Sequence, residues 1–369
     1  MNYFPLFDPI PLPAPVWLFK SLHILTLALH FVAVKILLGG LLAATVLNYF
    51  GLSNNLYRGA SAALARRLPI IMTYVINLGV PPLLFSQVLY GPALYTSNVL
   101  IGLYWIAIVF LLMACYWMLY QFADGALEGK RVWWKGLLAW ILAGCISRIF
   151  STNMALMLKP EVWNEMYSSS ALGAYLPPYD PTLLPRWLFM LSGGFAVAGL
   201  WMVWIAGRRS VEPPLNKFLS GLGGRLTVFM VIVQAFQFHF VLKAQPSVVI
   251  EGLSGSIFLN TAMDSWYLIA GLVLVFSLWV SIKKPCSYAA GYIAVLLVLL
   301  LVAAWTIVRD GIRDLTLASK GFDVWNQHVV ANWSVIWIFF LSFGLGIASL
   351  VWLISVMMKA KLVKEGELS

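Results

Sequence analysis

The chain has 369 residues, of which 62% are hydrophobic and only 10% are charged, and its mean hydropathy is +0.88. This composition excludes an ordinary soluble globular domain and predicts an integral membrane protein. In a soluble protein the net charge of +10 would suggest nucleic-acid binding. In this chain we attribute the charge to basic loops that orient membrane helices, so we expect no nucleic acid among the partners.

Apolar segments follow one another along nearly the whole chain. A hydrocarbon core of ~30 Å needs about 20 apolar residues per helix, and little sequence remains for a soluble domain. We therefore interpret residues 1–369 as a single all-α transmembrane domain. Clusters of helix-breaking residues divide it into nine predicted spans. They lie near residues 16–50, 67–91, 97–123, 132–158, 184–207, 223–243, 262–283, 286–308 and 331–358.

The basic residues predict the orientation of these spans. If the N-terminus lies outside, most of the 24 Lys and Arg residues fall in the inner loops and in the segment after residue 358. Positive charge collects on the cytoplasmic side of membrane proteins. The sequence therefore predicts an outside N-terminus, a cytoplasmic C-terminus and an odd number of spans.

The second predicted span contains the segment NLGVPPLLFSQ. Pro81 and Pro82 remove two backbone donors, so we expect a kink above Gly79. One interpretation is a simple packing kink. The other is that the freed carbonyls, together with Asn77 and Gln87, line a cavity or a cofactor site, because non-helical backbone inside a membrane must face protein or water.

Charged and thiol groups exclude several function classes. We place none of the 14 acidic residues deep in a span, so we expect no carboxylate relay of the kind used by proton pumps or cation-coupled carriers. This weakens the case for a small-molecule transporter. The three cysteines form no CxxC or CxxCH pattern, which argues against a disulfide framework and against covalently attached haem.

The four histidines are the strongest candidates for a site. His23 and His30 are seven residues apart, so they lie on one helix face at depths that differ by ~10 Å. We place His239, near the outer end of the sixth span, at the depth of His23. His30 lies closer to the midplane, and His328 lies just outside the ninth span.

Imidazole is a usual axial ligand of b-type haem, which also needs an apolar, aromatic-rich pocket. We therefore predict haem b, with His23 and His239 as the axial pair and His30 as the other candidate for the iron. The alternative for each histidine is a hydrogen bond between helices. Other metal sites are disfavoured because the chain has no HExxH motif and no cysteine cluster.

Arg148 lies in the middle of the fourth predicted span, in GCISRIFSTN. An arginine at this depth costs ~2.5 to 3.5 kcal/mol on insertion scales and should have a partner. A haem propionate or a quinone oxygen would be a suitable partner, and the alternative is an arginine that reaches the interface or caps a carbonyl. Lys35 in the first span presents the same two alternatives.

Several segments of the sequence resemble a known family of membrane proteins. LALHFVAVKILLGGLLAA resembles the first helix of subunit I of the cytochrome bd quinol oxidases, and VINLGVPPLLFSQVLYG resembles the region of its second helix. Three segments resemble more closely a group of short bd-like membrane proteins that are associated with periplasmic multihaem c-type cytochromes. These are LHFVAVKILLGG, NLGVPPLLFSQVLYGPALYTSNVLIG and LPRWLFMLSGGFAVAGL, and the resemblance covers about the first 210 residues.

The resemblance implies a bd-oxidase-like helical bundle in the bacterial inner membrane. It also implies that His30 ligates haem iron. Gln87 stands where the oxidases have a carboxylate, and Phe189 stands where the fifth span has a histidine. These departures remove groups that oxygen reduction requires. The resemblance therefore favours a bd-oxidase-like helical bundle and argues against the reduction of dioxygen.

From these observations we expect a b-haem subunit that passes electrons between the quinone pool and an outer-face c-type cytochrome. It would be part of a quinol:cytochrome oxidoreductase complex, not an enzyme alone. The alternative is a cofactor-free membrane anchor for a multihaem cytochrome. We expect a quinone pocket near the outer helix ends, where Tyr95, Trp187 and Trp266 lie, and a docking surface on the predicted outer loops 159–183 and 309–330.

Overall fold

The computed structural model describes residues 4, 10–51, 54–170, 172–208 and 213–366, and in this part of the chain it is helical with no named strand. Short 3-10 turns occupy Pro160–Val162 and Val324–Asn326. The helices are α1 (Val16–Phe50), α2 (Asn55–Ala65), α3 (Leu68–Leu100), α4 (Gly102–Leu127), α5 (Trp133–Leu156), α6 (Trp163–Ser169), α7 (Leu183–Ala206), α8 (Pro213–Lys243), α9 (Ser247–Gly255), α10 (Ile257–Lys283), α11 (Tyr288–Ala318) and α12 (Trp333–Gly366).

Within these residues, eight helices are long and apolar enough to cross a membrane, with α2 and α3 forming one continuous candidate. The all-α membrane character predicted from the sequence is therefore confirmed. The ninth predicted span, 331–358, falls on α12, whose described apolar part covers only Trp333–Gly346. The count of nine spans and the orientation stay predictions.

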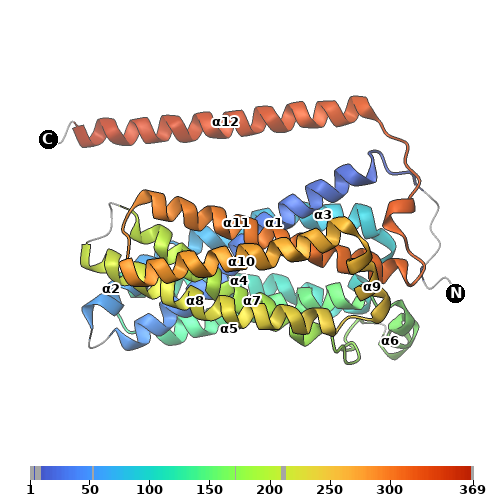
Figure 1. The fold of residues 1–369 in the computed structure, drawn as a ribbon, viewed down its shortest axis with the longest axis horizontal. Coiled ribbons are helices and arrows are strands. Elements are labelled where there is room, and N and C mark those ends of the chain that lie inside the picture. Colours follow the sequence, from blue (N-terminus) through green and yellow to red (C-terminus); the bar gives the residue numbers. More distant parts are fainter. Residues whose placement is uncertain (1–3, 5–9, 52–53, 171, 209–212, 367–369) are drawn as a thin grey trace. The chain divides into compact units, whose positions relative to one another are not determined.

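The chain separates into two compact units. The larger unit, from Lys20 to Val324, contains α2 to α11 and most of α1, and its long helices run along a common direction (Figure 1). Within it, α6 and α9 lie at one end and α2 lies at the other. In the smaller unit Leu12 forms a parallel bridge with Val329, and its amide donates to the carbonyl of His328.

The most buried helix of the larger unit is α7, which packs against α8 through small residues. A Cβ at Gly199 would lie only 2.6 Å from the carbonyl oxygen of Gly223. Thr227 in α8 donates to the carbonyl of Ala196, 3.1 Å away. Small residues let membrane helices approach closely, so their position on α7 explains why this helix lies inside the bundle.

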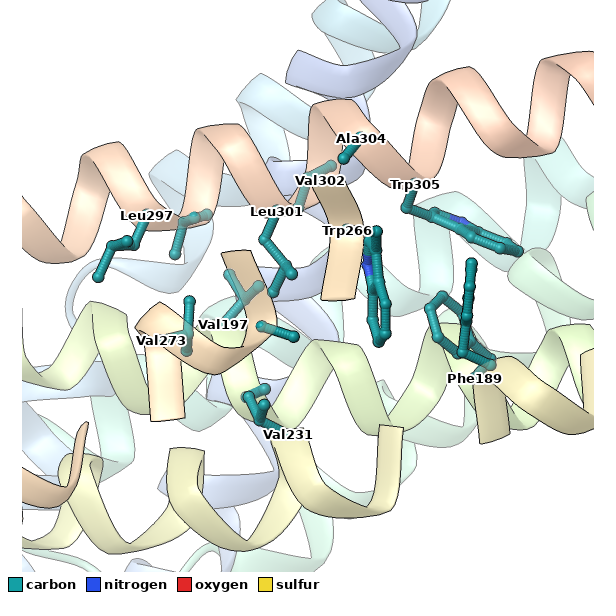
Figure 2. Close-up of a cluster of buried hydrophobic side chains, with 14 of the residues drawn as sticks. Phe189, Val197, Val231, Trp266, Val273, Leu297, Leu301, Val302, Ala304 and Trp305 are labelled. Carbon is teal, nitrogen blue, oxygen red and sulfur yellow. The ribbon is translucent and has the colours of Figure 1, made fainter. Parts of the chain in front are cut away.

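An aromatic cluster lies beside α7, at the position where the family resemblance led us to look for a histidine. The ring centroids of Phe189 and Trp305 are 4.3 Å apart, and Trp266 stacks on Phe238 at 4.4 Å. Figure 2 shows Phe189, Trp266 and Trp305 together, with aliphatic side chains extending the cluster along the helices. Trp266 is fully buried in this core. Trp266, one of the aromatic residues that we expected near a quinone pocket, is thus part of a packed core, and the pocket itself stays a prediction.

The expected kink in α3 occurs elsewhere. The helix continues through Pro81 and Pro82, and its non-helical residue is Tyr90, with φ −128° and ψ 26°, just before Gly91 and Pro92. Asn77 and Gln87 are exposed and make local bonds, Asn77 to the carbonyl of Thr73 and Gln87 to the hydroxyl of Tyr95. The interpretation that they line a cofactor site is not supported by these contacts.

The end of α11 also differs from the prediction. We expected a span at 286–308 followed by an outer loop, but the helix continues to Ala318 and carries Asp310, which is only 2% exposed. The absence of acidic residues deep in a membrane span stays a prediction, but the assignment of Asp310 to an outer loop is wrong. Local composition suggested a loop because it does not reveal that groups on other helices compensate the charge of Asp310.

Candidate functional site

Two cavities lie side by side in the larger unit. The smaller, which we call the histidine cavity, has a volume of about 370 Å³ and is lined by residues of α1, α3, α4, α5, α7 and α11. The larger, which we call the lysine cavity, has a volume of about 870 Å³ and lies among α1, α5, α7 and the segment 176–184. They share six lining residues, which are Val34, Leu38, Ser147, Leu183, Trp187 and Met190.

His30 lines the histidine cavity with one ring nitrogen held by the protein. Its Nδ1 lies 3.1 Å from the carbonyl oxygen of Val75. A carbonyl only accepts, so Nδ1 carries the proton and Nε2 keeps its lone pair. The ring packs on Gly79, where a Cβ would approach Cε1 to 3.0 Å. The absence of a side chain at Gly79 therefore allows the imidazole to pack directly against α3.

His23 also lines this cavity, but the protein uses both of its ring nitrogens. Nδ1 lies 3.1 Å from the carbonyl oxygen of Pro82, and Nε2 lies 3.0 Å from Nη1 of Arg313. Because arginine can only donate, Nε2 is the acceptor and Nδ1–H donates to Pro82. His23 is 1% exposed. It could bind iron only by giving up its bond from Arg313.

His239 is on the exposed side of α8 and lines neither cavity. The preceding residue, Phe238, is fully buried, and one residue along a helix turns the side chain by about 100°. His239 therefore faces away from the core. The structure does not bring His23 and His239 together, so the predicted axial pair is not assembled. Similar depth in the membrane did not imply a shared interior face.

His328 belongs to the smaller unit. In that unit its backbone carbonyl accepts a hydrogen bond from Leu12, 2.8 Å away.

A buried ion network adjoins the histidine cavity. Lys20 forms ion pairs with Asp310 and Asp314 and donates to the hydroxyl of Tyr90, 2.8 Å away. Tyr90 in turn donates to Asp314 at 2.8 Å. Its members are Lys20, His23, Tyr90, Asp310, Arg313 and Asp314.

The formal charges of this network cancel when His23 is neutral. Lys20 and Arg313 are balanced by Asp310 and Asp314, and Asp310 lies 3.6 Å from both Arg313 and His23. Buried charges are tolerated when they are paired and hydrogen-bonded. The network therefore explains how α11 carries Asp310 and Arg313 inside the bundle, and it fixes His23 as a structural residue.

Arg309 is the cation of the histidine cavity that has no anionic partner. Its guanidinium lies 5.5 Å from the ring of Phe31, and its Nη1 is buried without a hydrogen-bond partner in the described part of the chain. Arg186, on the same cavity, is instead held by Asp180 and Thr182. In the part of the chain that the structure describes, no acidic side chain lines the cavity. The site therefore offers a free guanidinium donor to an anion.

The donor groups of this cavity are of the kinds that hold a haem. His30 provides an available Nε2, Arg309 provides an unpaired donor for a propionate, and the walls are mainly aliphatic and aromatic. Methionine sulfur is a known second axial ligand, and three methionines line the cavity, Met72, Met154 and Met190. Among the described residues there is no group of three or more His, Cys, Asp or Glu that could hold a metal ion by themselves.

Arg148 lines the lysine cavity and not the histidine cavity. It is exposed, and it forms no hydrogen bond or ion pair with the described residues. The role of propionate partner that we predicted for Arg148 is therefore better filled by Arg309. The sequence interpretation missed Arg309 because we had assigned it to an outer loop.

A scan against protein-family models and a search of curated proteins each found no match to the chain.

Proposed function

We propose that the chain is a b-haem-binding membrane subunit of a bacterial respiratory complex. It passes electrons between the quinone pool of the inner membrane and a c-type cytochrome partner on the outer face. The observation that carries this proposal is the histidine cavity, where the unpartnered Nη1 of Arg309 and the uncommitted Nε2 of His30 line one apolar pocket.

The residues of the cavity have distinct roles in this proposal. Val75 orients the imidazole of His30 through its carbonyl, which also makes the ring a stronger ligand. Arg309 neutralises a propionate, and the apolar walls exclude water. A bound haem supplies one-electron transfer.

A second candidate function is a cofactor-free anchor that docks a multihaem cytochrome. Two observations favour it. His23 is fully engaged by protein groups, and Phe189 fills the position of a family ligand with an aromatic core. The two candidates differ in haem content, because an anchor of this kind would contain none.

The quinone link has a direct test. Adding a reduced quinone to the oxidised, purified protein should produce the spectrum of reduced b-type haem, and adding an oxidised quinone to the reduced protein should reverse it. A quinone analogue that cannot be reduced should slow both changes. A haem-containing preparation that exchanges no electrons with quinones would show that the electrons come from another donor.

The outer-face partner is the other part of the proposal. In the predicted loop 159–183, α6 and the segment after it expose large side chains, among them Tyr167 in the helix and Leu172 and Tyr179 beyond it. Much of 309–330 is instead the end of α11, and Lys320 pairs with Glu161 at 2.6 Å. We therefore restrict the docking surface to 163–183. Aromatic residues are enriched in protein interfaces, which supports a protein partner here.

We expect a tagged chain to copurify with a c-type cytochrome, and we expect serine at both Tyr167 and Tyr179 to reduce the recovered cytochrome by at least half. The control is serine at Tyr292, which is exposed on α11 outside this segment. A complex whose partners all bind the cytoplasmic side would contradict the proposal.

A further inference from the structure

The lysine cavity contains a buried cation, Lys35, that does not line the histidine cavity. Lys35 in α1 is 3% exposed and lines this cavity. Among the described residues it forms no hydrogen bond or ion pair, and its ammonium lies 5.9 Å from the centroid of the Phe189 ring. A buried amine without an acceptor is costly, so its presence points to an acceptor supplied by a ligand.

The surroundings hold Lys35 in a fixed position. Its Nζ and the amide nitrogen of Gln234 both pack so closely over Gly193 that a Cβ there would collide with each of them. Gln234 is itself held by its donation to the carbonyl of Phe189, 3.4 Å away. The ammonium of Lys35 and the side-chain amide of Gln234 therefore meet at Gly193. In the described part of the chain no acceptor is bonded to the ammonium, and Oε1 of Gln234 is also buried without a hydrogen-bond partner.

His30 and Lys35 serve different cavities because of their spacing. Five residues along an α-helix correspond to about 140° around its axis. His30 accordingly lines the histidine cavity, whereas Lys35 lines the lysine cavity. Trp187 and Met190 in α7 line both, so a molecule beside Lys35 would be separated from the haem site by shared side chains.

The lysine cavity has the chemistry of a site for a neutral, ring-shaped lipid. Its volume of about 870 Å³ lies within the range of about 300–1,000 Å³ typical of small-molecule sites. Trp140 and Trp187 provide flat apolar walls, and Arg148 provides a second donor from α5. Ile141 and Leu184 are exposed at its edge, on surface that an acyl or isoprenoid chain can contact.

We propose that the lysine cavity binds the head group of a quinone, with Lys35 donating to one quinone oxygen. This inference rests on the proposed function for the identity of the ligand. A quinone has two carbonyl acceptors on a flat ring and a long apolar tail, which matches the buried donor Lys35, the aromatic walls and the apolar edge of the cavity. A phosphate head group is the competing ligand, because Lys35, Arg148 and Lys159 line the cavity, but Asp180 in the same lining opposes a second anion.

The test uses the full chain in lipid nanodiscs with a photoreactive quinone. Lys35→Met keeps the length and packing of the side chain but removes the donor, and we expect at least tenfold weaker labelling. Lys283→Met is the control, because Lys283 is exposed and lines neither cavity. In the wild type the label should map to peptides of α5 and α7. Haem content is measured on every sample and should not change in Lys35→Met.

A second variant protects the test against misfolding. Gly144 lines the lysine cavity, and a Cβ there would meet nothing within 4 Å. Gly144→Leu should therefore fill the cavity without a backbone clash and should also reduce labelling at least tenfold. Unchanged labelling in both variants would overturn the inference, as would a phospholipid that copurifies with the wild type, resists displacement by quinone and is lost in Lys35→Met. Failure of the proposed function would be distinguishable, because the wild-type chain would then contain no haem.

Discussion

Replacing His30 by alanine is expected to remove the b-type haem from the purified protein. His30 is the histidine of the cavity whose Nε2 is not used by the protein, because Nδ1–H already donates to Val75. The iron would lose its imidazole ligand, and no neighbouring histidine could replace it without breaking another contact. Haem per protein, measured as the pyridine haemochrome, should fall to below a tenth of the wild-type value.

His239→Ala is the matched control for this experiment. His239 is exposed on α8 and lines neither cavity, so its replacement should leave haem content unchanged. His23→Ala should act mainly on stability, because it removes the contacts to Pro82 and Arg313. Haem retained in His30→Ala and lost in both His23→Ala and His239→Ala would instead support the axial pair that we first predicted from the sequence.

The largest expected effect on stability is at Asp310. Replacing Asp310 by asparagine leaves Lys20 and Arg313 with one carboxylate, Asp314, of the network formed by the described residues. Removing one partner of a buried ion pair costs about 3–5 kcal/mol of the free energy of unfolding, because the remaining charge is uncompensated. Thermal unfolding in detergent should therefore shift strongly downwards. Asp264→Asn, on the exposed side of α10, should have little effect.

A double variant separates charge balance from a general packing defect. Lys20→Met removes one of the two cations of the network, so in combination with Asp310→Asn it restores equal numbers of buried charges. The combined destabilisation should be clearly smaller than the sum of the two single effects, as expected for residues in direct contact. Additive effects would show that the ion pair does not act as a unit.

Apolar length and helix breakers predicted the membrane character and many of the helices. The first predicted span, 16–50, has the bounds of α1. The end of α11 was missed because RDGIRD was interpreted as a polar loop. A usable signal was present, since Val308, Ile312 and Thr316 continue the four-residue spacing of a buried face, and all three are buried.

The candidate site was only partly predictable, because its key properties depend on contacts between distant segments. His30 was identified through the family resemblance, but the sequence does not reveal which histidine keeps a free ring nitrogen. That follows from the contacts of His23 with Pro82 and Arg313. Likewise, the sequence does not show that Arg309 lacks an anionic partner, because this depends on the ion pair between Asp310 and Lys20.

The presence of haem is the central claim, and the visible spectrum of the purified wild-type chain tests it most directly. The reduced-minus-oxidised difference spectrum should show b-type bands, and the pyridine haemochrome should identify haem b. A correctly folded chain, purified from cells supplied with haem, that shows no b-type bands would contradict the account and favour the cofactor-free anchor.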